Sequence, residues 1–264
     1  MDIASVKIAA FQMFVTPDVD KNLEKIRGAM STAAGSGSDV LVLPECAVSG
    51  YPPLHHREKS DIDLSRISEA NAEIVELAAR HGVWVIGGTI TRNDRTLYNS
   101  ALVISPRGLI GQYDKMHLIG GDGLFFGKGQ TLPTFDFGGA PFGVQICYDA
   151  RFPEPFRYLK GQGATAVFCI FNACEGATWK VPVLEGTCRS RAAENHFHMV
   201  AVNAAGPLQM VVSRICDPDG VSLAEAKADT EEMVYARLDL SSVGPGFYAD
   251  RRTDLYEVVF RAGL

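Results

Sequence analysis

The sequence predicts an α/β fold with mixed β-sheets, and the apolar pattern supports this in two ways. Short apolar runs have strand length, whereas the segments between several of them carry apolar residues at helical steps. The runs between residues 83 and 113 follow one another with short turns, so antiparallel as well as parallel pairing is expected. The expected strands are residues 6–14, 39–43, 83–90, 98–104, 110–113, 142–146, 166–171, 197–203, 209–215 and 233–238.

Helices are expected between these strands. Apolar side chains recur at three- and four-residue steps in residues 19–34 and 67–81, and residues 154–161 and 180–195 are also predicted to be helical. The Gly-Ser segment at residues 35–38 is short and follows a helical pattern, so it is interpreted as a helix-stopping loop. With no linker in view, we expect one domain over residues 1–264.

Composition and charge limit the partners and the compartment. The formal net charge is −6, from 25 basic and 31 acidic residues, which disfavours nucleic acid and anionic membrane surfaces as partners. The six cysteines form no C-x-x-C pair, so a reducing cytoplasmic location is expected. The histidines at positions 55, 56, 196 and 198 lack accompanying ligand spacing, so we expect no metal and no other cofactor.

Three polar residues stand where strand-like runs end. Glu45 follows residues 40–44, Lys115 follows residues 110–114, and Cys147 follows residues 142–146. Corners between strand and loop are where α/β enzymes place nucleophiles. Any one of these residues alone would be interpreted as a buried cysteine or a solvated charge, but a base, a cation and a thiol at three strand ends together indicate a catalytic site.

The sequence segments that contain these residues resemble the motifs of a known enzyme family. Residues 43–51 (LPECAVSGY), 113–118 (YDKMHL) and 146–154 (ICYDARFPE) resemble, in this order, the Glu, Lys and Cys motifs of the nitrilase, or carbon–nitrogen hydrolase, superfamily. The likeness extends from residues 6–12 (VKIAAFQ) to residues 250–256 (DRRTDLY). It implies a four-layer α-β-β-α sandwich with two mixed sheets, and a homodimer or larger assembly built on helical faces.

The chemistry of a thiol nucleophile assigns roles to the three residues. A cysteine thiol near its reference pKa of about 8.5 is mostly protonated at neutral pH and needs a base, for which Glu45 is the candidate. Lys115 and the backbone N–H of Tyr148 are candidates to stabilise the charge that grows during attack. Substrate contacts are expected from Tyr51, Phe126 and Tyr148, and from a wall formed by Asn172 and Ala173.

One position departs from the family pattern. Many relatives carry a second Glu seven residues after the Lys, where it orients the substrate amide, and this sequence has Asp122 there. Asp122 is therefore expected to take the second-carboxylate role with a shorter reach, or else to be a solvated loop residue.

The resemblance implies hydrolysis of a non-peptide carbon–nitrogen bond. We expect an amidase that converts a small amide to a carboxylic acid and ammonia through a Cys thioester. A nitrilase or a carbamoyl-amine hydrolase is the alternative, so the expected partner is a small-molecule amide or nitrile. The alternative from another class is a non-catalytic nitrilase-like protein that binds a metabolite or recruits a partner.

Overall fold

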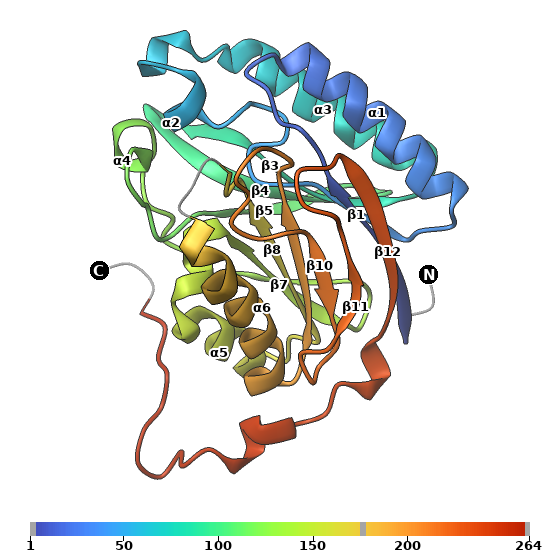
Figure 1. Cartoon of the computed structure of the whole chain (residues 1–264), viewed down its shortest axis with the longest axis vertical. Helices are drawn as coiled ribbons and strands as arrows, with labels where there is room; N and C mark the ends of the chain where they lie inside the picture. The colour runs from blue at the N-terminus through green and yellow to red at the C-terminus, as the bar shows by residue number, and fades with distance from the viewer. Residues whose placement is uncertain (1–3, 175–177, 262–264) are drawn as a thin grey trace.

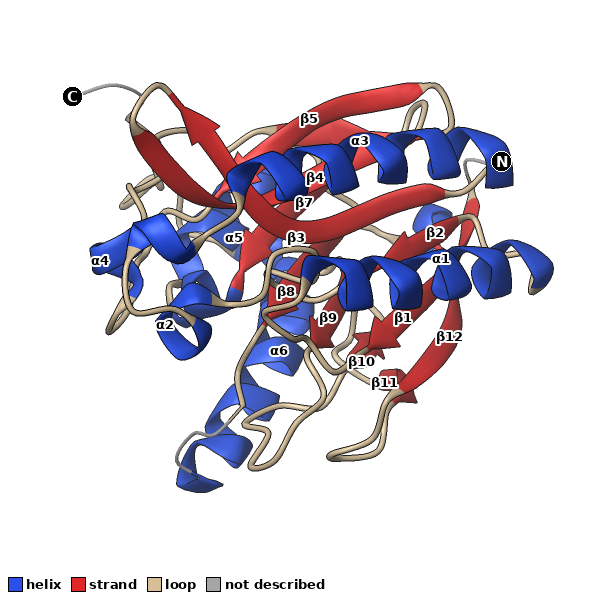
Figure 2. Ribbon diagram, turned by 90° about the horizontal axis from the view of Figure 1, so that it is seen from above, coloured by secondary structure: helices blue, strands red, loops and turns tan. Residues whose placement is uncertain are grey.

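The computed structural model describes residues 4–174 and 178–261 of the 264-residue chain. Its centre consists of two six-stranded β-sheets that stack on each other, with a helical layer on the outer face of each (Figures 1 and 2). The predicted four-layer α-β-β-α sandwich with two mixed sheets is therefore confirmed.

The first sheet has the strand order β12-β1-β2-β3-β4-β5. Strands β1, β2 and β3 are parallel to one another, and the remaining neighbours are antiparallel. The bounds are β1 Ser5–Gln12, β2 Val40–Val42, β3 Trp84–Asn93, β4 Thr96–Ser105, β5 Gly108–Asp114 and β12 Glu232–Asp239.

The second sheet has the order β11-β10-β9-β8-β7-β6 and repeats this plan. Strands β7, β8 and β9 are parallel, and β6, β10 and β11 pair antiparallel at the two sides. The bounds are β6 Thr134–Asp136, β7 Pro141–Ile146, β8 Ala166–Phe171, β9 His198–Asn203, β10 Arg214–Cys216 and β11 Ser222–Glu225.

Helices α1 (Val19–Gly35) and α3 (Leu64–His81) pack side by side on the first sheet, and α5 (Pro153–Gly161) and α6 (Val181–Asn195) cover the second (Figures 1 and 2). Two short helices, α2 (Pro52–His55) and α4 (Asp122–Phe125), contact each other. Single 3₁₀ turns lie at Lys59–Asp61, Cys147–Arg151, Thr178–Lys180, Leu240–Ser242 and Gly246–Asp250.

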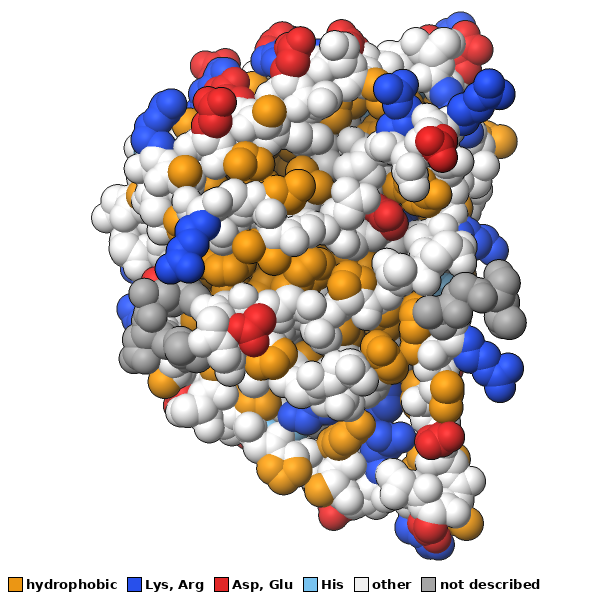
Figure 3. All heavy atoms as spheres, turned by 180° about the vertical axis from the view of Figure 1, so that it is seen from behind, with side chains coloured by type: hydrophobic (Ala, Val, Ile, Leu, Met, Phe, Trp, Pro, Cys, Tyr) orange, Lys and Arg blue, Asp and Glu red, His pale blue; other side chains and the backbone are white. Residues whose placement is uncertain are grey.

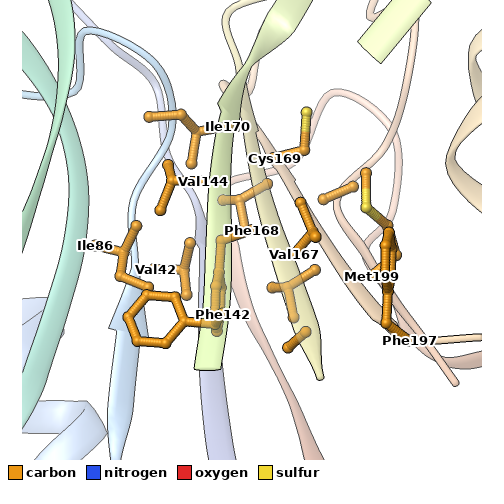
Figure 4. Packing of buried hydrophobic residues seen from close by; sticks show 14 of the residues in the cluster. Val42, Ile86, Phe142, Val144, Val167, Phe168, Cys169, Ile170, Phe197 and Met199 are labelled. Atoms are coloured by element: carbon orange, nitrogen blue, oxygen red, sulfur yellow. The ribbon is translucent and has the colours of Figure 1, made fainter. Parts of the chain in front are cut away.

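The main core fills the space between the sheets. Val42 and Ile86 of the first sheet lie opposite Phe142 and Val144 of the second (Figure 4), and all four are fully buried. Residues of β8 alternate between the two faces of the sheet, because successive strand side chains point in opposite directions. Cys169 accordingly lies on the helical side of the second sheet, away from Val42 and Ile86.

The surface opposite the view of Figure 1 carries hydrophobic side chains across its middle, with charged side chains mainly above and below (Figure 3). No helix in the described part of the chain is both long enough and apolar enough to span a lipid bilayer.

The sequence predicted most elements within a few residues, and its errors are in short elements. The strand expected at residues 209–215 is largely loop, since β10 contains only Arg214–Cys216. Strands β6 and β11 and helices α2 and α4 were not expected. Such short segments carry too few periods of an apolar pattern to be identified. A turn lies at residues 217–220, with the N–H of Gly220 donating to the carbonyl of Asp217 at 3.0 Å.

Candidate active site

Strand ends from both sheets converge at the predicted site. Cys147 directly follows β7 of the second sheet, and Lys115 directly follows β5 of the first. Glu45 lies shortly after β2, and its backbone N–H donates to the carbonyl of Phe171, the last residue of β8, at 3.2 Å. This hydrogen bond joins the two sheets at the site. The base, the cation and the thiol expected from the sequence are therefore brought together.

Lys115 is at the centre of a buried charge cluster. Its Nζ lies 2.8 Å from Oε1 of Glu45 and 2.8 Å from Oδ2 of Asp122, and each of the three side chains is at most 1% exposed. Removing charges from water is costly unless each is paired and fully hydrogen-bonded. The ammonium thus holds the two carboxylates in one arrangement, and Asp122 is not the solvated loop residue that the sequence left open.

Two further donors fix the carboxylate of Glu45. The Nδ2 of Asn99, in β4, donates to Oε1 at 2.7 Å, and the backbone N–H of Asn172 donates to Oε2 at 2.8 Å. With Lys115 also donating to Oε1, both oxygens have partners. Hydrogen bonds to a buried carboxylate restrict its rotation, so Glu45 is held in one orientation.

Asp122 is held equally firmly. Its Oδ1 accepts from the hydroxyl of Tyr51 at 2.5 Å, and its Oδ2 accepts from the backbone N–H of Ile119 at 3.1 Å in addition to Lys115. Burial and the negative charge of Glu45 raise the pKa of Tyr51 far above its usual range, so this hydroxyl remains a donor. The geometry makes Asp122 a partner of Lys115 and Tyr51.

Cys147 occupies a strained turn between β7 and the 3₁₀ turn that it begins. Its φ is 47°, in the left-handed region that L-residues adopt at a cost of about 1–3 kcal/mol. The buried carboxylate of Asp149 supports the turn by accepting the backbone N–H of Ile146 at 3.1 Å and the hydroxyl of Tyr113 at 2.8 Å. Its other oxygen accepts the backbone N–H of His117 at 2.9 Å. Asp149 therefore ties the cysteine turn to the segment that carries the lysine.

The surroundings favour the neutral thiol in the resting protein. Burial, followed by the negative charge of Glu45, raises the pKa of Cys147 well above its usual range, while the ammonium of Lys115 acts in the opposite direction. A thiolate at Cys147 therefore forms only when a nearby group accepts the proton, and Glu45 is the charged group that acts most strongly on the pKa of this thiol.

A cavity of about 520 Å³ opens above the thiol. Of the residues expected to contact substrate, Tyr51, Tyr148, Asn172 and Ala173 line it, whereas Phe126 does not. Phe126 is 4% exposed and belongs to the hydrophobic cluster between the first sheet and its helices. It follows the end of α4, where the chain directs its side chain into the core. The other lining residues are Leu54, Ile119, Cys147, Arg151, Phe152, Phe171, Cys174, Lys180, Leu184 and Met210.

Comparison with known proteins decides the family. The model of the carbon–nitrogen hydrolase family matches residues 7–246. A nitrilase from Pyrococcus abyssi is 31% identical over 268 residues, covering 95% of this chain and 99% of the relative. The chain belongs to the carbon–nitrogen hydrolase family.

Other relatives of this carbon–nitrogen hydrolase are amidases. The omega-amidase NIT3 of Saccharomyces cerevisiae is 30% identical over 259 residues, with 89% of this chain and 87% of the relative covered. A crystal structure of an amidase from Nesterenkonia sp. superimposes with a TM-score of 0.82 at 21% identity, covering 97% of this chain and 96% of that one. The fold and the amidase-like class expected from the sequence are confirmed.

Sequence reasoning missed several polar residues of this carbon–nitrogen hydrolase. Asn99 lies inside an apolar strand pattern, and a polar residue in such a pattern was the available signal. The structure buries this amide fully, and a buried amide requires hydrogen-bond partners. Asp149 lies two residues after the cysteine, within a string already quoted for its family likeness. Arg151 and Lys180 were not considered as cavity residues. Among the residues that the structure describes, no group of three or more His, Cys, Asp or Glu side chains is arranged to hold a metal ion.

Proposed function

We propose that this carbon–nitrogen hydrolase cleaves small non-peptide amides to a carboxylic acid and ammonia through a thioester on Cys147. The observation that carries the proposal is the contact of one buried ammonium, Lys115, with Glu45 and Asp122 at 2.8 Å each, beside a thiol that opens into a cavity. A cavity of about 520 Å³ is in the size range of small-molecule sites. The omega-amidase name of one relative agrees with this chemistry.

The first half-reaction acylates the enzyme. Glu45 takes the proton of the Cys147 thiol as the sulfur attacks the amide carbon, and the carbonyl oxygen gains negative charge. Lys115 and the backbone N–H of Tyr148 stabilise that oxygen. When the tetrahedral intermediate collapses, the carbon–nitrogen bond breaks, Glu45 returns its proton to the leaving nitrogen, and ammonia departs from a thioester.

The second half-reaction releases the acid. Glu45, again unprotonated, takes a proton from a water molecule as its oxygen attacks the thioester carbon. The carbon–sulfur bond then breaks, the sulfur leaves as the thiolate, and Glu45 returns the proton to it. One carboxylate thus serves four proton transfers, and its fixation by Asn99 and Asn172 keeps it in reach of both sulfur and substrate.

Asp122 acts through Lys115 and Tyr51 in this scheme. Its two oxygens already accept three hydrogen bonds, and its side chain is fully buried behind the cavity. We therefore assign to it the positioning of the ammonium and of the Tyr51 ring. In this assignment Asp122 does not contact the substrate nitrogen directly.

The test is ammonia release from a panel of small amides, nitriles and carbamoyl compounds, with Cys147→Ala as the inactive control. Hydrolysis of amides above the other two classes supports the proposal. Preferential hydrolysis of nitriles would favour the alternative that the Pyrococcus relative's name suggests. No turnover of any class, together with an unreactive Cys147 thiol, would support a non-catalytic binding protein.

A further inference from the structure

One buried carboxylate, Asp149, lies close to the nucleophile in the chain but does not face the substrate. Its side chain is fully buried, and it is not among the described residues that line the active-site cavity. Its Oδ1 is bound by the backbone N–H of His117 at 2.9 Å and lies 2.7 Å from the Nδ1 of the same residue. Its Oδ2 accepts the backbone N–H of Ile146 at 3.1 Å and the hydroxyl of Tyr113 at 2.8 Å. These four contacts replace the water that a buried carboxylate loses.

The hydrogen bond to Ile146 closes a turn that contains two reacting groups. Cys147 and Tyr148 are the two residues between Ile146 and Asp149, so this bond spans both of them. Within the turn Cys147 has a φ of 47°, a conformation that an L-residue keeps only where its surroundings hold it. The next peptide plane carries the backbone N–H of Tyr148. The direction of that N–H therefore depends on the same turn as the position of the thiol.

The other contacts of Asp149 lie on both sides of the ammonium proposed to stabilise the oxyanion. Tyr113 is two residues before Lys115, and His117 is two residues after it. Tyr113 belongs to β5 of the first sheet, whereas the turn that begins at Cys147 follows β7 of the second. The carboxylate thus joins two strand ends from different sheets. A shift of the lysine segment relative to the cysteine turn would have to break hydrogen bonds to Asp149.

We propose that Asp149 is a positioning residue that aligns the three groups acting on the substrate carbonyl, namely the Cys147 thiol, the Tyr148 N–H and the Lys115 ammonium. This inference rests on the proposed function. Asp149 acts through the backbone and touches none of the reacting atoms. Donors stabilise a growing oxyanion only when they are already aimed at it. Loss of Asp149 should therefore slow the step that forms the oxyanion more than it alters substrate binding or the reactivity of the thiol itself.

The variant Asp149→Asn tests this role with almost no change in volume. The amide nitrogen is a donor and stands where an oxygen accepted two hydrogen bonds, so two donors of the network lose their acceptor. Ammonia release from butyramide should show a kcat lowered about a hundredfold and a KM within about threefold of the parent value. Asp136→Asn is the matched control, because Asp136 accepts the backbone N–H groups of Gly138 and Gly139 in an exposed turn away from the cavity. The control should leave kcat unchanged.

Alkylation of Cys147 separates the alignment of the oxyanion donors from general damage to the site. Iodoacetamide reacts at a saturated carbon, where the sulfur–carbon bond forms as iodide leaves and the thiol proton passes to Glu45. No charge develops on a carbonyl oxygen, so this reaction needs no oxyanion donor. The alkylation rate of Asp149→Asn should therefore remain close to that of the parent. An equal fall in alkylation rate and kcat would make Asp149 a purely structural residue and overturn the proposal.

Butyraldehyde tests the alignment without any turnover of amide. Its carbonyl carbon bonds to the sulfur of Cys147 while the thiol proton passes through Glu45 to the carbonyl oxygen, which gives a hemithioacetal with no leaving group. The oxygen of this adduct lies where the oxyanion would form. Calorimetry should show binding to the parent, none to Cys147→Ala, and a Kd about tenfold or more weaker in Asp149→Asn. Asp136→Asn should bind the aldehyde like the parent.

These measurements distinguish the positioning role from the amidase proposal. Parent-like kcat and aldehyde binding in Asp149→Asn would overturn the positioning role and leave the amidase standing. Aldehyde binding that depends on Asp149, in a parent that hydrolyses no amide, would support the positioning role and refute the amidase. A parent that shows neither hydrolysis nor aldehyde binding would refute both.

Tyr113→Phe decides the question should Asp149→Asn fail to fold. This variant keeps the carboxylate and the closed cysteine turn but removes one hydrogen bond on the lysine side. It should weaken butyraldehyde binding about threefold to tenfold at an unchanged alkylation rate. Aldehyde binding equal to that of the parent would overturn the proposal.

Discussion

Replacing Lys115 with methionine removes the ammonium from the buried cluster while keeping an unbranched side chain in its place. At 2.8 Å and an effective dielectric constant of about 20, each contact with a carboxylate is worth roughly 6 kcal/mol before the cost of desolvation is subtracted. Removing one partner of a buried ion pair typically costs about 3–5 kcal/mol of stability, because the remaining charge has lost its compensation. Here two carboxylates, Glu45 and Asp122, would be left facing each other.

The expected loss is large against the total stability of an ordinary protein, which is about 5–15 kcal/mol. For a chain of this size it corresponds to a fall in the thermal midpoint on the order of 10 °C. Removal of an oxyanion partner should also lower kcat about a hundredfold or more, with a smaller change in KM. Differential scanning calorimetry and ammonia release measure the two effects.

Two further variants make the reasoning refutable. Lys128→Met makes the same substitution at an exposed site and should change neither quantity. The double variant Lys115→Met with Glu45→Gln removes one of the unpaired carboxylates and should regain part of the lost stability, although it remains inactive. A Lys115→Met protein with the midpoint and kcat of the parent would show that the ammonium is dispensable, and the mechanism proposed above would be wrong.

Three other predictions concern the partners of Lys115. Mass spectrometry of the parent with a slow substrate should find an acyl adduct on Cys147, and substantial hydrolysis by Cys147→Ala would remove it as the nucleophile. Glu45→Gln should abolish turnover. Because burial and then the charge of Glu45 raise the pKa of Cys147, the pH midpoint of Cys147 alkylation by iodoacetamide should fall in this variant. An unchanged midpoint would contradict the interaction between Glu45 and Cys147. Asp122→Asn should lower kcat at least about tenfold by weakening the hold on Lys115, whereas parent-like activity would make the carboxylate a bystander.

Much of the fold could be predicted because it depends on local patterns. Strand length and helical periodicity are visible within ten to twenty residues, and the long elements therefore matched the prediction within a few positions. The short helices α2 and α4 depend on their contact with each other and could not be seen in this way. The misassigned Phe126 has the same origin, since its inward position is decided by how α4 ends.

The sequence by itself determined which residues stand at the strand ends, namely Glu45, Lys115 and Cys147, and the family likeness of the strings around them. Only the tertiary structure decided that these ends meet, because Glu45 lies 70 residues from Lys115 and 127 from Asn172 in the chain. No local pattern encodes contacts over such separations; they follow from the stacking of two sheets whose strands end at the same place. The same stacking buries Asp122 behind the cavity. The position of Asp122 seven residues after Lys115 in the sequence could not reveal this burial.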